Sequence, residues 1–344
     1  MPPDRSDIVD REIELTELRE LSARPGSHMA LIYGRRRVGK TYLLDRVWDE
    51  DERFYFLVAD ATADRNRHDL LLEFGRWSET NIEPDDYPNW RTTFRLLAQA
   101  AEQRPMVVVL DEFQFLMESD EGVTSQLNAI WDREVQDADL TLILCGSEVA
   151  TIEQLERGDS PLYGRINWRQ KLRPFDYFDA AEMVPGYSNR DKAYAWGVYG
   201  GIPQYLSAIL PNETVHESIC RNFLTNRGEV HLQLENLIEQ ERGIRNAGIY
   251  RAVLDAVAAG HTETNKIAQA AGLQGSTMTA RRALKTLEEL ELIATERNFG
   301  DRGGTLRHRI RDNAMRFWHR FVSKNRSRLE MGDTDTVWTN HVEP

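Results

Sequence analysis

Residues 28–41 read His-Met-Ala-Leu-Ile-Tyr-Gly-Arg-Arg-Arg-Val-Gly-Lys-Thr. An apolar segment of strand length, 28–33, runs into the pattern G-x-x-x-x-G-K-T, and a helical pattern follows. This order is typical of a loop that binds nucleoside triphosphate, because its glycines let successive backbone N–H groups point at the phosphates. Lys40 would reach the β and γ oxygens, and Thr41 would ligate Mg²⁺. The predicted binding residues are Gly34, Arg35, Arg36, Arg37, Val38, Gly39, Lys40, Thr41 and Tyr42.

A second motif supports this interpretation. Residues 106–110 form a fully apolar run that ends in two adjacent carboxylates, Asp111 and Glu112. In P-loop proteins such a strand carries the Walker B motif, so Asp111 would hold Mg²⁺ and Glu112 would act as general base on the attacking water. The alternative is a buried strand followed by an ordinary Asp-Glu turn. Residues 53–58 predict a further strand between the two motifs, which fits P-loop proteins that insert a strand between Walker A and B.

Composition limits the class of protein. A chain of 344 residues with 41% hydrophobic residues can bury a large core and is long enough for two or three domains. No apolar run approaches the ~18 residues that span a bilayer, and the charged start lacks a signal-peptide core, so we expect a cytoplasmic protein with no membrane partner. Two cysteines are too few for a cysteine-type metal cluster.

The charge balance is acidic. The formal net charge is −13, and only six of the 43 basic residues are lysines. Excess carboxylates with few lysines are typical of proteins adapted to high intracellular salt, because carboxylates keep a surface hydrated and repulsive under strong screening. A G+C-rich genome is the alternative explanation for the many arginines.

Two polar residues follow the motifs. Ser147 ends the apolar run 140–146, where a side chain that senses the γ-phosphate would lie, but a serine there can equally cap a following helix. Arg165 follows the turn-like segment 161–164. It would approach the γ-phosphate from its own or a neighbouring subunit, and the alternative is a surface salt bridge.

The rest of the chain predicts further domains. We expect an α/β fold: a P-loop core with a parallel sheet over 1–175, followed by a helical lid over 176–242, a winged helix over 243–322 and a tail over 323–344. The winged helix is predicted from three helical patterns followed by two strand patterns joined by the glycine-rich segment 299–304.

The predicted winged helix is less acidic than the remainder of the chain. Residues 261–311 hold nine Lys/Arg and six Asp/Glu. This contrast favours DNA binding, with base contacts near the start of the third helix and phosphate contacts from basic side chains. The alternative is a protein-interaction module. The candidate DNA-binding residues are Ser276, Thr277, Thr279, Arg281, Arg282, Lys285 and Arg302.

With these motifs identified, the chain resembles the archaeal-type ATPases of the STAND class, the signal-transduction ATPases related to AAA+ proteins. The likeness extends over nearly the whole chain. It rests on the segments 9–15, 34–41, 110–114, 146–147, 161–165 and 200–203, and the arginine-rich loop is especially characteristic. The resemblance implies that Arg11 lies near the adenine and that Pro203 closes over the base from the lid. Asp10 stands where the family usually has glycine.

The segment 307–326 is similar to the start of a domain that commonly follows such ATPases and is often nuclease-like. Since the chain stops at Pro344, we expect no nuclease activity. The aromatic residues Phe317, Trp318 and Phe321 would serve either as core packing or as a docking surface for a protein partner.

Together these features predict an ATP-binding, slowly hydrolysing, Mg²⁺-dependent switch that couples nucleotide state to a winged-helix output. A DNA-binding transcriptional or mobile-element regulator with ATP as a structural ligand is one alternative, and a protein-interaction scaffold is another. A homo-oligomer would be required if Arg165 acts across subunits.

Overall fold

The computed structural model describes residues 8–241, 244, 246–273, 275–297 and 306–343. The chain forms two compact units, 1–173 and 174–344.

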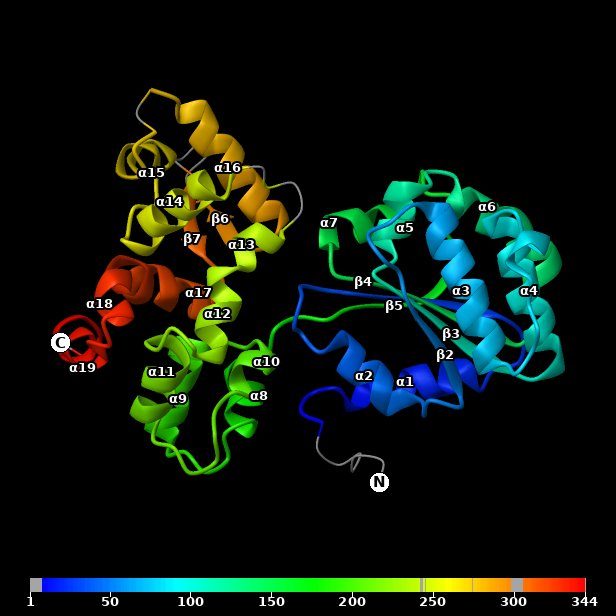
Figure 1. The fold of residues 1–344 in the computed structure, drawn as a ribbon, viewed down its shortest axis with the longest axis horizontal. Helices are drawn as coiled ribbons and strands as arrows, with labels where there is room; N and C mark the ends of the chain where they lie inside the picture. Colours follow the sequence, from blue (N-terminus) through cyan, green and yellow to red (C-terminus); the bar gives the residue numbers. More distant parts are fainter. Residues whose placement is uncertain (1–7, 242–243, 245, 274, 298–305, 344) are drawn as a thin grey trace. The chain divides into compact units, whose positions relative to one another are not determined.

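The first unit is built on a five-stranded parallel sheet (Figure 1). Its strands lie in the order β2-β3-β4-β1-β5. Their bounds are His28–Tyr33 for β1, Arg53–Leu57 for β2, Met106–Asp111 for β3, Leu140–Gly146 for β4 and Ile166–Lys171 for β5. The two motif strands β1 and β3 are therefore separated in the sheet by β4, whereas β2, which comes between them in the sequence, lies at an edge. The expected α/β class with a parallel sheet is confirmed.

Helices cover both faces of this sheet, as a parallel sheet requires. Figure 1 shows α1 and α2 on one side and α3, α4 and α6 on the other. Alternate residues of β1 and β3, such as Leu31 and Leu110, pack with Phe74 and Phe94 in one core. The helices of this unit are α1 Glu12–Ser22, α2 Lys40–Val47, α3 Ala63–Trp77, α4 Trp90–Gln103, α5 Gln114–Ser119, α6 Val123–Ile130 and α7 Val149–Ile152.

The second unit is mainly helical. Its first part contains α8 Tyr177–Glu182, α9 Asn189–Tyr199, α10 Pro203–Leu206, α11 Val215–Phe223, α12 Glu229–Glu235 and α13 Leu237–Gln240. Three longer helices follow, α14 Ala247–Ala258, α15 Thr264–Ala270 and α16 Thr277–Glu289. An antiparallel pair, β6 Ile293–Glu296 and β7 Arg307–Ile310, comes next. The chain ends in α17 Asn313–Phe317, α18 Arg326–Glu330 and α19 Thr334–Val337, with short helical turns between and after them.

The last part of the chain packs back on the first helices of this unit. Asn313 donates to the carbonyl of Trp196 at 2.9 Å, and the ring of Phe317 lies 5.0 Å from the ring of Phe223. Phe317 and Trp318 are buried, and Phe321 is half-buried. Of the two roles that the sequence allows for these aromatic residues, core packing is therefore the one that Phe317 and Trp318 adopt.

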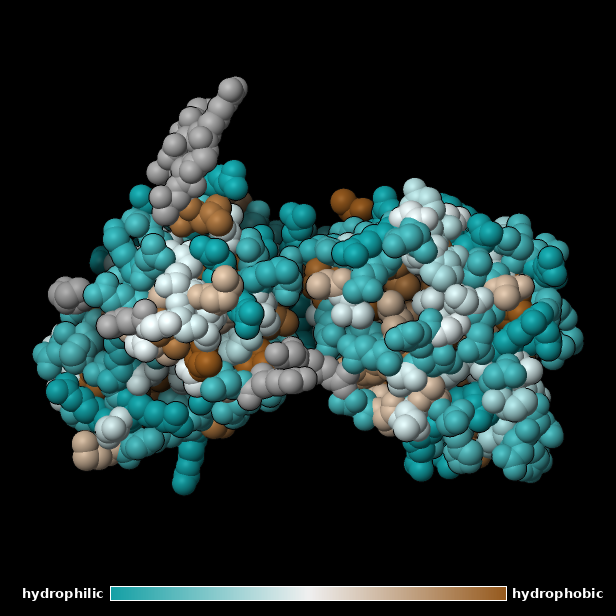
Figure 2. All heavy atoms as spheres, turned by 90° about the horizontal axis from the view of Figure 1, so that it is seen from above, coloured by the Kyte–Doolittle hydropathy of each residue, from teal (hydrophilic) through white to brown (hydrophobic). Residues whose placement is uncertain are grey.

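The visible surface is largely hydrophilic. Figure 2 shows a face on which hydrophilic side chains predominate, with hydrophobic ones scattered among them. Among the residues with assigned positions, no helix has the length and apolar character needed to cross a membrane.

Gly201 marks a point where two backbones approach closely. The Phe175 amide donates to the Gly201 carbonyl at 2.7 Å, and a Cβ on Gly201 would lie 1.9 Å from the Phe175 carbonyl oxygen. This contact is between backbone atoms, so no side-chain rotation relieves it. The position therefore requires glycine.

We predict that Gly201→Ala destabilises the second unit by about 2 kcal/mol or more, because the added methyl forces the backbones apart. Thermal or denaturant unfolding measures this. Gly197→Ala is the matched control, because nothing lies within 4 Å of a Cβ at that position inside α9. It should leave stability unchanged or raise it by up to ~1 kcal/mol. Equal stability of both variants would contradict the close approach at Gly201.

Candidate functional site

The glycine-rich loop connects β1 to α2. Gly39, at φ 93°, caps α2, and Lys40 and Thr41 are its first residues. The Lys40 ammonium is buried and donates to the carbonyls of Gly34 at 2.8 Å and Arg35 at 3.3 Å. A Cβ on Gly34 would lie 2.3 Å from the Leu172 carbonyl oxygen, whereas nothing lies within 4 Å of one on Gly39. The loop is thus pressed against the sheet on one side and open at the start of α2.

The remaining loop residues differ in exposure. Val38 is buried and anchors the loop in the core. Arg35, Arg36 and Arg37 are half-buried, and Arg37 has φ 72°. Tyr42 is 46% exposed, and the Arg46 guanidinium stacks on its ring at 3.2 Å. The main chain and Lys40, rather than Tyr42, therefore define the floor of the site.

The carboxyl ends of β1 and β3 bring the two motifs together. Thr41 Oγ1 lies 3.4 Å from Asp111 Oδ2. The Tyr55 hydroxyl, from β2, donates to the same carboxylate oxygen. Burial, together with the nearby Asp111 charge, raises the pKa of Tyr55, so this hydroxyl stays protonated and remains a donor at neutral pH.

Glu112 is held in a defined orientation beside this cluster. Its Oε2 accepts from the Ser147 amide at 3.2 Å, from Ser147 Oγ at 2.7 Å and from the side-chain amide of Gln114. The backbone of Glu112 is left-handed, with φ 56°, a conformation that costs a non-glycine residue about 1–3 kcal/mol. Such strain persists only where surrounding contacts fix it, and here Gln114 is fully buried and Ser147 nearly so.

Ser147 does not cap the next helix. The N-cap of α7 is Glu148, and it makes no side-chain capping bond. The Ser147 hydroxyl is instead directed to Glu112, so the helix-cap alternative is wrong for this residue.

Arg165 forms a surface salt bridge, which is the alternative to a phosphate contact that the sequence allows. Its guanidinium lies 2.6 Å from the carboxylate of Asp132, and both side chains are partly exposed. Arg11 donates to the Arg173 carbonyl at 2.8 Å and pairs with Asp10 at 3.0 Å. Asp10 has φ 50°, a left-handed conformation that glycine adopts more readily than other residues. Pro203 is the first residue of α10 in the second unit, where its fixed φ suits a helix start.

The candidate DNA-binding residues lie on or before α16. Ser276 caps this helix by accepting from the Thr279 amide. Arg281, Arg282 and Lys285 are exposed, and Lys285 lies 3.5 Å from Glu289. Thr277 is the first residue of α16. Arg302 lies outside the described residues.

Residues 8–209 match the family described as an ATPase domain predominantly from Archaea. The chain belongs to this ATPase family. The match covers the glycine-rich loop, both carboxylates of the second motif, Ser147, Arg165 and Pro203.

The chain is also similar to a relative of unassigned function and to solved structures with the same fold. The chain is 29% identical over 339 residues to MJECL04, an uncharacterized protein of Methanocaldococcus jannaschii, covering 95% of this chain and 72% of that one. A Walker-type ATPase of Pyrococcus abyssi, PABY2304, has the same fold, with a TM-score of 0.67, 23% identity and coverage of 92% and 97%. The Aeropyrum pernix ORC2 protein, solved as ADPNP–ADP complexes, has a TM-score of 0.61, 15% identity and coverage of 96% of both chains.

The site suits a nucleotide with a magnesium ion. The loop provides N–H groups at the start of α2 and a buried ammonium, which favour phosphate. Thr41 and Asp111 provide oxygen atoms of the kind that Mg²⁺ prefers, with room left for water ligands. Within the described ranges, no cluster of three or more His, Cys, Asp or Glu side chains could hold a metal by itself.

Two residues of this site have no role that the sequence predicts. Tyr55 belongs to a predicted strand. Because side chains alternate between the two faces of a strand, Tyr55 lies on the face opposite to Phe54 and Phe56, and this alternation is its only signal in the sequence. Gln114 follows the second motif closely, but nothing in the local pattern indicates its function. Both act through contacts with the two motif carboxylates.

Proposed function

We propose that the chain is an ATP-hydrolysing molecular switch of the STAND type, which converts ATP and water to ADP and phosphate in the presence of Mg²⁺. The observation that carries the proposal is the convergence of Lys40, Thr41, Asp111 and Glu112 at one edge of the sheet, with Glu112 oriented by Ser147 and Gln114.

Each residue has a role that follows from its chemistry. Lys40 and the loop amides bind the β and γ phosphates and offset their charge. Thr41 and Asp111 hold Mg²⁺, which neutralises charge on the phosphate oxygens. Glu112 accepts a proton from the attacking water. Its Oε2 already accepts three hydrogen bonds. The water would therefore donate to Oε1, or to Oε2 after one of its present donors has moved away.

Ser147 is suited to couple the phosphate to the general base. Its hydroxyl donates to Glu112 Oε2 at 2.7 Å. Ser147 directly follows β4, which pairs with β1, the strand that leads into the phosphate loop. A hydroxyl that turns toward a γ-phosphate would remove one of the three hydrogen bonds that Glu112 Oε2 accepts. We assign the sensor role to Ser147 on this basis.

Three further assignments complete the proposal. Arg165 would exchange Asp132 for the γ-phosphate, in its own subunit or in a homo-oligomer. Arg11 would contact the adenine, and Pro203 would close over the base. Nucleotide state would then change the arrangement of the core (1–175), a helical lid (176–242), a winged helix (243–322) and the tail (323–344).

ATP turnover by wild type, Lys40→Ala and Glu112→Gln tests the enzyme assignment. Lys40→Ala should lose nucleotide binding, because the buried ammonium that meets the phosphates is gone. Glu112→Gln should bind ATP normally and lose at least about 100-fold in turnover, because an amide cannot accept the proton. Steady-state phosphate release and nucleotide titration measure the two quantities.

The matched controls are Lys324→Ala and Glu121→Gln, which change exposed side chains outside the site. Both should behave as wild type. If all five proteins turn over ATP at the same rate, the chain is not a P-loop ATPase of the proposed kind.

DNA binding by the winged helix is a second candidate function, favoured by the exposed Arg281, Arg282 and Lys285 on α16. For such a regulator ATP is a structural ligand. Binding to duplex DNA should weaken steeply with salt, because phosphate contacts release counterions.

Arg281→Ala/Arg282→Ala should weaken DNA binding and flatten the salt dependence by about two units of slope, because each arginine would neutralise one phosphate. Arg133→Ala, an exposed arginine of the first unit, is the control. Fluorescence anisotropy with a labelled duplex at several salt concentrations measures the affinity and its salt dependence for each variant. Salt-independent or absent binding would favour a protein-interaction scaffold instead.

A further inference from the structure

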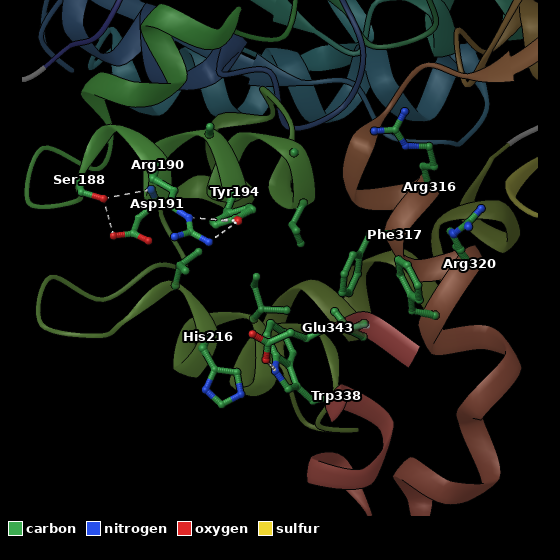
Figure 3. A pocket seen from close by; sticks show the side chains of 17 residues that line it. Ser188, Arg190, Asp191, Tyr194, His216, Arg316, Phe317, Arg320, Trp338 and Glu343 are labelled. Atoms are coloured by element: carbon green, nitrogen blue, oxygen red, sulfur yellow. Dashed lines mark hydrogen bonds between the residues drawn. The ribbon is translucent and has the colours of Figure 1, made fainter. Parts of the chain in front are cut away.

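The second unit contains a large groove that the proposed ATPase chemistry does not use. Its volume is about 1350 Å³, above the roughly 300–1,000 Å³ that is usual for small-molecule pockets. Four segments line it: α9, α11, the helical stretch 316–321 and the last turn 338–343 (Figure 3). A groove of this size between helices fits a segment of polypeptide better than a metabolite.

The lining is formed by continuous helix faces. On α9 the lining positions are 190, 191, 193, 194, 197 and 198, and on the opposite helical stretch they are 316, 317, 320 and 321. Residues three and four apart lie on one face of a helix, so each wall is a stripe that runs along its helix. In Figure 3, Arg190 and Tyr194 lie on one side of the groove and Phe317 on the other. Two facing stripes of this kind are the setting in which an added helix packs.

Part of the lining is apolar and accessible. Tyr194 is 48% exposed, and Phe321 and Trp338 are half-buried. On α9, Ala193 and Gly197 are four residues apart, and a Cβ on Gly197 would meet no atom within 4 Å. Glycine inside a helix costs ~1 kcal/mol relative to alanine. Here it leaves space where another helix backbone can approach.

The charges around the groove are mostly positive. Arg190, Arg316 and Arg320 line it, and within the described part of the chain none of them forms a salt bridge. Arg190 donates to the Tyr194 hydroxyl at 3.0 Å, and Arg320 donates to the Ala258 carbonyl at 3.1 Å. The carboxylate of the neighbouring Asp191 interacts electrostatically with Arg190, so among the described residues the lining arginines without a carboxylate partner are Arg316 and Arg320.

Two carboxylates also line the groove, and both accept hydrogen bonds from neutral donors. Asp191 accepts from the Ser188 hydroxyl at 2.7 Å, and Glu343 accepts from the Trp338 indole at 2.6 Å. With three arginines and two carboxylates, the lining is weakly cationic and partly aromatic, on a chain whose formal net charge is −13. An acidic partner would be repelled by most of this protein and attracted here.

We propose that this groove binds an acidic amphipathic helix of a partner protein. The helix lays its apolar face on Tyr194, Phe321 and Trp338 and approaches α9 closely at Gly197. Its carboxylates pair with Arg316 and Arg320 at the rim. This inference is independent of the proposed ATPase function, because every residue involved lies in the second unit.

The test uses the full chain and a fluorescein-labelled synthetic peptide of about 15 residues, long enough to form a helix on binding. Leucines repeat every three or four residues, and glutamates occupy the opposite face. Anisotropy titration should show binding that weakens as salt rises from about 0.1 M to about 1 M. A peptide with lysine in place of glutamate and a scrambled acidic peptide should each bind at least tenfold more weakly.

Two variants locate the binding. Arg316→Glu/Arg320→Glu should weaken binding of the acidic peptide at least tenfold and strengthen binding of the lysine peptide. Gly197→Leu should abolish binding by filling the space above α9, while circular dichroism and ATP binding stay as in wild type. Arg133→Glu, the same charge change in the first unit, should bind as wild type.

Several outcomes would overturn the proposal. These are no peptide binding up to about 1 mM, equal binding of the scrambled peptide, or full binding by both groove variants. Binding of the small aromatic anion anilinonaphthalene sulfonate in the groove without peptide binding would assign it to a small ligand. Self-association of the chain that Gly197→Leu abolishes would assign it to a second copy.

Discussion

The structure of the candidate site depends on one constraint, the placement of β4 between β1 and β3 in a parallel sheet. Parallel strands present their carboxyl ends at the same edge, so the loop after β1 and the carboxylates after β3 must meet there. The contact that results is between Thr41 and Asp111, 70 positions apart in sequence. Tyr55 strengthens it from the edge strand by donating to the same oxygen. A pair of short motifs thereby forms the site at which we propose that phosphate and a cation bind.

The second consequence of this arrangement is the position of Glu112. The end of β4 delivers Ser147 to the carboxylate, and Gln114 reaches it from the first turn after β3. These contacts hold Glu112 in a strained backbone conformation that the free chain would avoid. A general base that is fixed before substrate arrives needs little reorganisation during the reaction.

The sequence predicted those features that are encoded by adjacent residues. The glycine-rich loop, the apolar strands and the helix after the loop all follow from local patterns, and the parallel sheet follows from their order. Contacts between distant residues could not be predicted in this way. Tyr55 meets Asp111 across 56 positions, and the groove of the second unit is assembled from segments between 188 and 343. Gly201 is similar, since only the neighbouring Phe175 backbone reveals why no side chain fits.

The central claim is that Asp111, held by Thr41 and Tyr55, makes nucleotide binding depend on magnesium. The direct measurement is titration of wild type, Asp111→Asn and Tyr55→Phe with a fluorescent ATP analogue, with and without Mg²⁺. We expect Mg²⁺ to tighten binding to wild type, to have little effect on Asp111→Asn, and to be needed at about tenfold higher concentration by Tyr55→Phe. The same magnesium dependence in all three proteins would contradict the claim.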